Sequence, residues 1–204
     1  MIRSSTSQIN GAFHNRAWAS LLVSGTGGSS SATLTVANGF TNEGTMTLNT
    51  AGNPVGSGEG SAMLNVTSGT LVNATGATIL STQANTLGGN FLNAALDNRG
   101  TLTVDYALTV DKPAAQHSNS GTINLRNDNL TVTQAGTSPL FATSGTIDIA
   151  AGRTLTVSGG TFHYDAGTLS GTGTLVLSST TAQITPNLSP PFNIELRSST
   201  LNGP

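Results

Sequence analysis

A short repeated phrase constrains the fold of this chain more than any other feature of its sequence. The dipeptide Gly-Thr is followed by two apolar residues that are one residue apart, and successive copies are 21 to 31 residues apart. Such alternation predicts a strand with one buried face. A unit of this size cannot bury its own apolar side chains, but a stack of such units can. The copies begin at Gly44, Gly69, Gly100, Gly121, Gly145 and Gly173.

A second alternating segment, with Leu and Val as its apolar pair, follows three of these copies. If equivalent segments lie in register, their side chains form vertical columns in a parallel β-helix, with neighbouring strands about 4.8 Å apart. The expected columns are Leu102/Ile123/Ile147/Leu175, Val104/Leu125/Ile149/Leu177, Leu108/Leu130/Leu155 and Val110/Val132/Val157. We therefore expect an all-β, right-handed parallel β-helix with irregular rungs of about 21–31 residues. The alternative, a β-sandwich, has similar strand lengths but gives no reason for the Gly-Thr spacing.

Two residue types in the repeat are typical of corners between strands. Glycine adopts a positive φ without steric cost, which we expect the corner to require. Asparagine precedes the glycine by two residues at Asn42, Asn98 and Asn119. Since the offset repeats, we expect these amides to form a hydrogen-bonded ladder from rung to rung.

The repeat divides the chain into three parts. Residues 1–31 lack it and are expected to form an N-terminal cap or irregular segment, and residues 32–185 are expected to form the β-helix. Residues 186–204 hold four of the seven prolines, a residue that disfavours central strands. No cap is evident at that end, so we expect the chain to be a segment of a longer protein.

Composition excludes several classes of protein. A net charge of −2 argues against a nucleic-acid binder that works through a basic patch. The absence of cysteine excludes disulfides and thiolate metal sites. No apolar run approaches the roughly 20 residues that a membrane-spanning helix needs.

The residues that could carry chemistry are scattered. Glycoside hydrolysis needs two carboxylates at one cleft, and no two acidic residues share an expected column. The three histidines, His14, His117 and His163, match no zinc spacing; we expect His117 in a loop and His163 pointing outward from a strand. We therefore predict no catalytic residue, no cofactor and no metal. Asp105 and Arg126 occupy equivalent positions and should form an exposed ion pair.

Outward Thr-x-Thr pairs suggest a second alternative, an ice-binding array. Asn124 and Asp148 stand where Thr103 would repeat, so this array is interrupted. Threonine also suits exposed strand positions in general.

Three phrases, in residues 96–104, 118–125 and 152–160, resemble the repeats of large secreted bacterial β-helix proteins. These are the filamentous-haemagglutinin-like adhesins and the autotransporter passenger domains. The resemblance extends over about residues 32–185. It implies export across the outer membrane and a stalk or adhesive surface outside the cell. The secretion domains of that family and an export signal are not recognisable here, and we expect them outside this chain.

The expected function is therefore a non-catalytic structural or adhesive rod segment of a secreted or surface-exposed bacterial protein. Its expected partners are further rungs of the same polypeptide and a host or environmental glycan or protein. The variable stretches at residues 52–60, 111–120 and 133–144 would bind the latter. A carbohydrate-active β-helix, such as a polysaccharide lyase or hydrolase, and the ice-binding solenoid are the alternatives.

Overall fold

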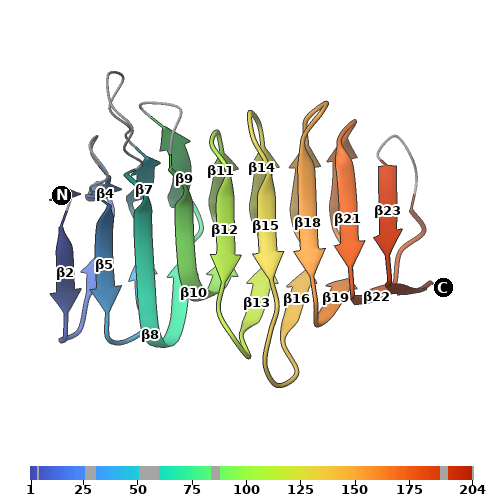
Figure 1. Ribbon diagram of the computed structural model, residues 1–204, viewed down its shortest axis with the longest axis horizontal. Helices are drawn as coiled ribbons and strands as arrows, with labels where there is room; N and C mark the ends of the chain where they lie inside the picture. The colour runs from blue at the N-terminus through green and yellow to red at the C-terminus, as the bar shows by residue number, and fades with distance from the viewer. Residues whose placement is uncertain (4, 26–30, 51–59, 84–87, 189–192, 204) are drawn as a thin grey trace.

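The chain forms a rod of stacked turns. The computed structural model describes residues 1–3, 5–25, 31–50, 60–83, 88–188 and 193–203. Within these residues the regular structure is all β, and parallel strands stacked about 24 residues apart form a solenoid of about 7 turns. The strands run across the rod axis, with the N-terminus at one end and the C-terminus at the other (Figure 1). The prediction of an all-β parallel β-helix is confirmed, and a β-sandwich is not formed.

Each turn, here called a rung, contributes strands to three faces of the rod. The first face consists of β1 (Ile2–Arg3), β4 (Ser20–Ser24), β7 (Thr45–Thr50), β9 (Thr78–Gln83), β11 (Thr101–Val104), β14 (Thr122–Leu125), β17 (Thr146–Ile149) and β20 (Thr168–Gly171). The second consists of β2 (Thr6–Ile9), β5 (Ala32–Val36), β12 (Leu108–Asp111), β15 (Leu130–Thr133), β18 (Thr154–Ser158), β21 (Thr174–Ser178) and β23 (Asn193–Arg197). The third consists of β3 (His14–Asn15), β6 (Phe40–Asn42), β13 (Gln116–Asn119), β16 (Leu140–Thr143), β19 (Thr161–Tyr164), β22 (Thr181–Ile184) and β24 (Thr200–Asn202).

Two long strands join the second and third faces. The first part of β8 (Ala62–Asn73) pairs with β5 and its last part pairs with β6. Strand β10 (Asn90–Asn98) likewise pairs with β12 and with β13. The second and third faces therefore form one continuous sheet that bends around the rod.

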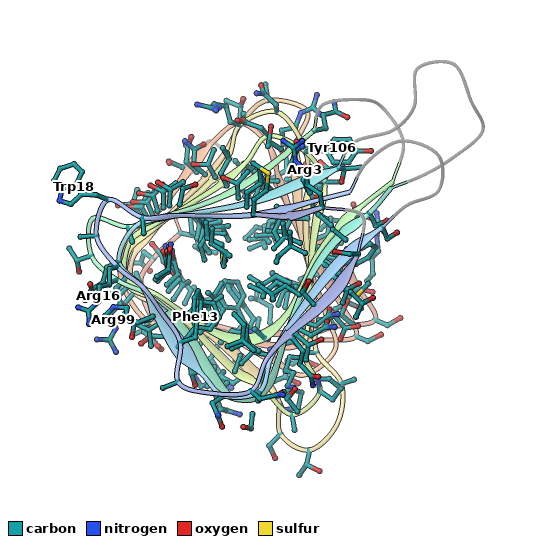
Figure 2. The ribbon with its side chains drawn as sticks, turned by 90° about the vertical axis from the view of Figure 1, so that its left-hand side faces the viewer. Arg3, Phe13, Arg16, Trp18, Arg99 and Tyr106 are labelled. Atoms are coloured by element: carbon teal, nitrogen blue, oxygen red, sulfur yellow. The ribbon has the colours of Figure 1, made fainter. Side chains whose placement is uncertain are left out.

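The core is a set of aliphatic columns inside a roughly triangular cross-section (Figure 2). Along most strands, buried residues alternate with partly exposed ones, as the sequence pattern predicts. The columns Leu108/Leu130/Leu155 and Val110/Val132/Val157 are formed as predicted. The first three members of both other columns are also in register. Stacking buries each of these side chains between its counterparts in the rungs above and below.

The last members assigned to two columns are wrong. Leu175 and Leu177 lie against Leu155 and Val157 on the second face, and Leu169 takes the position beside Ile147 on the first. The cause is local: three Gly-Thr dipeptides occur within residues 167–174, and the earliest of them continues the first face.

Parallel pairing also extends beyond residues 32–185. On the N-terminal side β2, β3 and β4 pair with β5, β6 and β7. On the C-terminal side β23 and β24 pair with β21 and β22. These strands lack the Gly-Thr phrase, but backbone hydrogen bonding between rungs does not require it.

The prediction of a positive φ holds at Gly69, with a φ of 76°, but most glycines of the repeat have a different purpose. Gly44, Gly100, Gly121 and Gly145 do not have a positive φ. A Cβ atom at any of them would instead collide with a backbone carbonyl oxygen of the preceding rung; at Gly121 the oxygen is that of Gly100. Glycine is needed at this corner because two backbones approach closely.

Candidate functional site

A ladder of asparagine side chains supports the corner where the third face turns into the first. Each Nδ2 donates to the Oδ1 of the next asparagine, with N–O distances of 2.6 to 2.8 Å. Each Nδ2 also donates to a backbone carbonyl of the first face in the next rung. We call this set the asparagine ladder; it comprises Asn15, Asn42, Asn73, Asn98 and Asn119, all buried.

The ladder ends in the middle of the rod. Asn119 donates to the hydroxyl of Thr143 at 3.0 Å, and the next position in the column is Tyr164. Tyr164 turns its hydroxyl to the carbonyl oxygen of Gly167. The predicted ladder through Asn42, Asn98 and Asn119 is therefore confirmed, and Asn15 and Asn73 extend it.

The turns that follow the ladder differ in length from rung to rung. After Asn42 and Asn98 only two residues separate the asparagine from the first face. After Asn15 and Asn73 four residues intervene, and each longer turn is closed by a backbone hydrogen bond, from Ala19 to Arg16 and from Ala77 to Ala74. Two projecting turns thus flank the short turn of the rung between them.

The gap between the two projecting turns is a notch of about 570 Å³, here called the corner notch. Its floor is the short turn of Glu43, Gly44 and Thr45. One wall is the turn of residues 17–20, and the other is formed by Thr75 and Gly76. The volume lies within the range of small-molecule sites, and the notch is open to solvent.

Trp18 borders this notch in an unusual conformation. It is the third residue of its turn and has a φ of 66°, in the region that bulky residues rarely adopt. The matching residue in the other projecting turn is Gly76, with a φ of 82°. The indole is fully exposed and extends outward from the corner (Figure 2). The chain therefore carries its one tryptophan where glycine would be unstrained.

Charged residues occupy the same corner. Arg16, Glu43 and Arg99 each follow a ladder asparagine directly. Glu43 Oε2 pairs with His14 Nε2 at 3.1 Å, and Arg99 Nε donates to Asp97 Oδ2 at 2.8 Å. Arg16 and Arg99 lie on the same side of the cross-section as Trp18 (Figure 2). At the notch itself, the charged group is the carboxylate of Glu43.

A second hollow, of about 470 Å³, lies on the second face. Asn93 donates to Asn65 Oδ1 across it, and Lys112 Nζ donates to the carbonyl oxygens of Val66 and Thr67. Residues 111–113 come from a stretch predicted to be a binding loop. Because two of the three Lys112 donors bind backbone carbonyl oxygens, we interpret this hollow as the place where the loop of residues 111–113 is held against the second face.

The loops predicted to bind a partner are shorter than expected. Within residues 111–120 the chain forms β13, and within residues 133–144 it forms β16. The connections before these strands are residues 112–115 and 134–139, and Ser120 and Ser144 begin the short turns after them. Most of the third stretch, residues 52–60, lies outside the described residues, because only Gly60 is described.

Two of the acidic side chains that could have carried chemistry, Asp105 and Asp148, have hydrogen-bond partners of their own. Asp105 accepts hydrogen bonds from Arg126 and Asn127, which confirms the predicted pair with Arg126. The guanidinium lowers the pKa of this carboxyl group. Asp148 accepts a hydrogen bond from Ser170. Across the described residues, no group of three or more His, Asp or Glu side chains could hold a metal ion.

The prediction that His117 lies in a loop is wrong. It is a core residue of β13, in the column between Leu96 and Phe141. Its Nδ1 accepts a hydrogen bond from the Leu96 amide at 3.3 Å, while Nε2 has no partner. Burial lowers its pKa to about 4, so the ring is neutral near pH 7. A polar residue among aliphatic columns could not be placed from the strand pattern alone.

Threonine does not form a continuous two-column array. The first position of the first-face strands is a hydroxyl residue from Ser20 to Thr168. Two positions further along, the column changes from Thr103 to Asn124 and Asp148, as predicted.

No family model, curated protein or solved structure matches the chain. No helix long and apolar enough to cross a membrane occurs among the described residues.

Proposed function

We propose that this chain is a structural rod segment of a larger secreted or surface-exposed bacterial protein, and that it presents adhesive features along its corners without performing catalysis. The observation that carries the proposal is the stack itself. Buried aliphatic columns and the asparagine ladder tie each rung to its neighbours, so that stiffness comes from repetition. The resemblance of residues 96–104, 118–125 and 152–160 to secreted β-helix repeats supports the location.

The surface of the rod is consistent with a passive scaffold. Charged residues make up 8% of the chain, and the ion pairs among the described residues lie at the surface. The acidic groups named above have separate partners, which gives a lyase or hydrolase no carboxylate pair among them.

A rod built from equivalent rungs should tolerate the removal of one whole rung. Deletion of residues 122–145 joins Gly121 to Thr146, which already pairs with Thr122 in register. We expect a folded, shorter solenoid. Deletion of residues 122–133 removes only two of the three strands and should give an unfolded protein. Equal behaviour of the two deletions in circular dichroism and thermal unfolding would contradict a modular scaffold.

The location and the lack of catalysis need separate tests. Antibodies against the segment should label intact cells of the source organism without permeabilisation. The purified chain should release no new reducing ends or unsaturated sugars from a panel of polysaccharides. Labelling only after permeabilisation would overturn the first part of the proposal, and cleavage would overturn the second.

A further inference from the structure

We infer that the corner notch is a saccharide-binding site that takes one neutral pyranose unit against the indole of Trp18. This inference rests on the proposed adhesive function and names the class of ligand. The notch combines an aromatic platform, a carboxylate and exposed hydroxyl groups within three neighbouring rungs.

The conformation of Trp18 is the first argument. The matching residue of the other projecting turn is Gly76, which adopts its positive φ without strain, whereas Trp18 is the one bulky aromatic among the described residues with a positive φ. An exposed indole at a positive φ adds strain and leaves apolar surface in water, so it stabilises neither the turn nor the core. Strained backbone of this kind is concentrated at binding and catalytic sites, so the conformation of Trp18 is explained if its ring contacts something outside the rod.

The chemistry of the notch is the second argument. A pyranose has one face of C–H groups, with partial positive charge, and a rim of hydroxyl groups. The electron-rich face of an indole attracts the C–H face. The Glu43 carboxylate, although its Oε2 pairs with His14, has further lone pairs that can accept hydrogen bonds from sugar hydroxyls. Thr45, Ser20 and Thr75, all exposed, supply further donors and acceptors.

The surroundings of the notch favour a small polar ligand over a protein. A stable protein interface buries about 800 Å² on each partner and has several apolar residues at its centre. The other large exposed apolar residues among those described are Met1, Leu196 and Leu201, which belong to the two ends of the rod. Trp18 is therefore a single exposed aromatic beside a notch that offers both polar and apolar surface. The Glu43 carboxylate in the floor disfavours an anionic sugar.

Because Trp18 is the single tryptophan, its fluorescence reports on the notch alone. The full chain is titrated with neutral oligosaccharides (glucose-, galactose- and mannose-based) and, in parallel, with a uronic-acid oligosaccharide. We expect a saturable change in emission with at least one neutral oligosaccharide, and at least tenfold weaker binding of the uronic acid. No response to any neutral sugar, or tighter binding of the uronic acid, would overturn the inference.

Variants then test the residues by calorimetry, which does not depend on the indole. Trp18→Gly copies the residue at the matching turn, so the fold is retained, and it should abolish binding. Glu43→Gln keeps the size of the side chain and should weaken binding at least tenfold. Arg197→Gln, at the far end of the rod, is the matched control and should bind as the parent does. Binding that persists in Trp18→Gly would overturn the inference.

Two other outcomes are informative. A blue shift of the emission that grows with protein concentration, without sugar, would show that Trp18 contacts a second copy, and would overturn the inference. The rung-deletion and cell-labelling experiments do not depend on sugar binding. A failed titration with intact rod behaviour therefore rejects the saccharide site alone.

Discussion

Removing one amide from the middle of the asparagine ladder should destabilise the rod well beyond an ordinary surface substitution. Asn98 is fully buried, and its Nδ2 donates to Asn119 Oδ1 at 2.7 Å and to the Thr122 carbonyl at 3.1 Å. Its Oδ1 accepts from Asn73 Nδ2 at 2.7 Å. Asn98→Ala deprives three polar groups of a partner, two in buried hydrogen bonds and one in a part-buried one. At roughly 1 kcal/mol for each, the free energy of unfolding should fall by about 3 kcal/mol.

The measurement is urea denaturation followed by circular dichroism, with the slope compared between variants to check that unfolding stays cooperative. Two variants calibrate the result. Asn119→Thr places at one position the residue that the chain itself uses at Thr143, and should cost only about 1 kcal/mol. Asn127→Ala removes an exposed amide and should cost at most about 0.5 kcal/mol. If Asn98→Ala costs no more than Asn127→Ala, the ladder does not hold the corner together.

Three further perturbations follow from single residues. The pKa of His117 is about 4 in the folded chain and about 6.5 in the unfolded chain, so the free energy of unfolding should fall by about 3 kcal/mol as the pH drops through this interval. His117→Leu should remove that loss. If urea titrations give the variant the same pH profile as the parent, this account of His117 is contradicted. Gly121→Ala places a Cβ atom against the carbonyl oxygen of Gly100 and should lower the free energy of unfolding by about 2 kcal/mol. Gly11→Ala has open space around the new Cβ atom and should leave stability unchanged. Equal melting temperatures of the two variants would refute the close-approach argument. Trp18→Gly relieves a positive φ and should leave the melting temperature unchanged or higher, and a clear decrease would show that the indole stabilises the turn.

The fold could be predicted at positions where a single physical requirement, such as burial of one strand face, determines the residue type. The alternation at Leu130 and Val132 has a period of two because one face of the strand is buried. Its recurrence at Leu155 and Val157 predicted the column that is formed. Register between rungs could be derived from such pairs because a shift by one residue would expose every buried side chain.

The face to which a strand belongs was ambiguous in the sequence, because the Gly-Thr phrase occurs at more than one corner of the rod. Gly173-Thr174 has the same pattern as Gly121-Thr122, yet it begins a strand of a different face. Asn73 belongs to the ladder although no glycine follows at the usual offset, because a longer turn replaces the short one. Turn length is set by a local hydrogen bond, which leaves no periodic signal.

The corner notch could not be predicted because it depends on the difference between neighbouring turns. Trp18 and Gly76 are 58 residues apart, and only the stacking of rungs places their turns on either side of Glu43. Trp18 falls within residues 1–31, which were expected to form a cap or irregular segment. The signal that could have identified it is the match between residues 15–19 and 73–77, where each asparagine is followed four residues later by alanine.

The central claim is that successive rungs lie in parallel register, so that distance along the rod depends on the number of rungs and not on the number of residues. Spin labels at Thr45 and Thr122 are three rungs apart, and labels at Thr45 and Thr168 are five rungs apart. With about 4.8 Å for each rung, pulsed electron resonance should give backbone separations of about 14 and 24 Å after correction for the label arms. The Thr45–Thr168 distance should exceed the Thr45–Thr122 distance by about two rungs. Any other difference between the two distances would contradict the stacked solenoid.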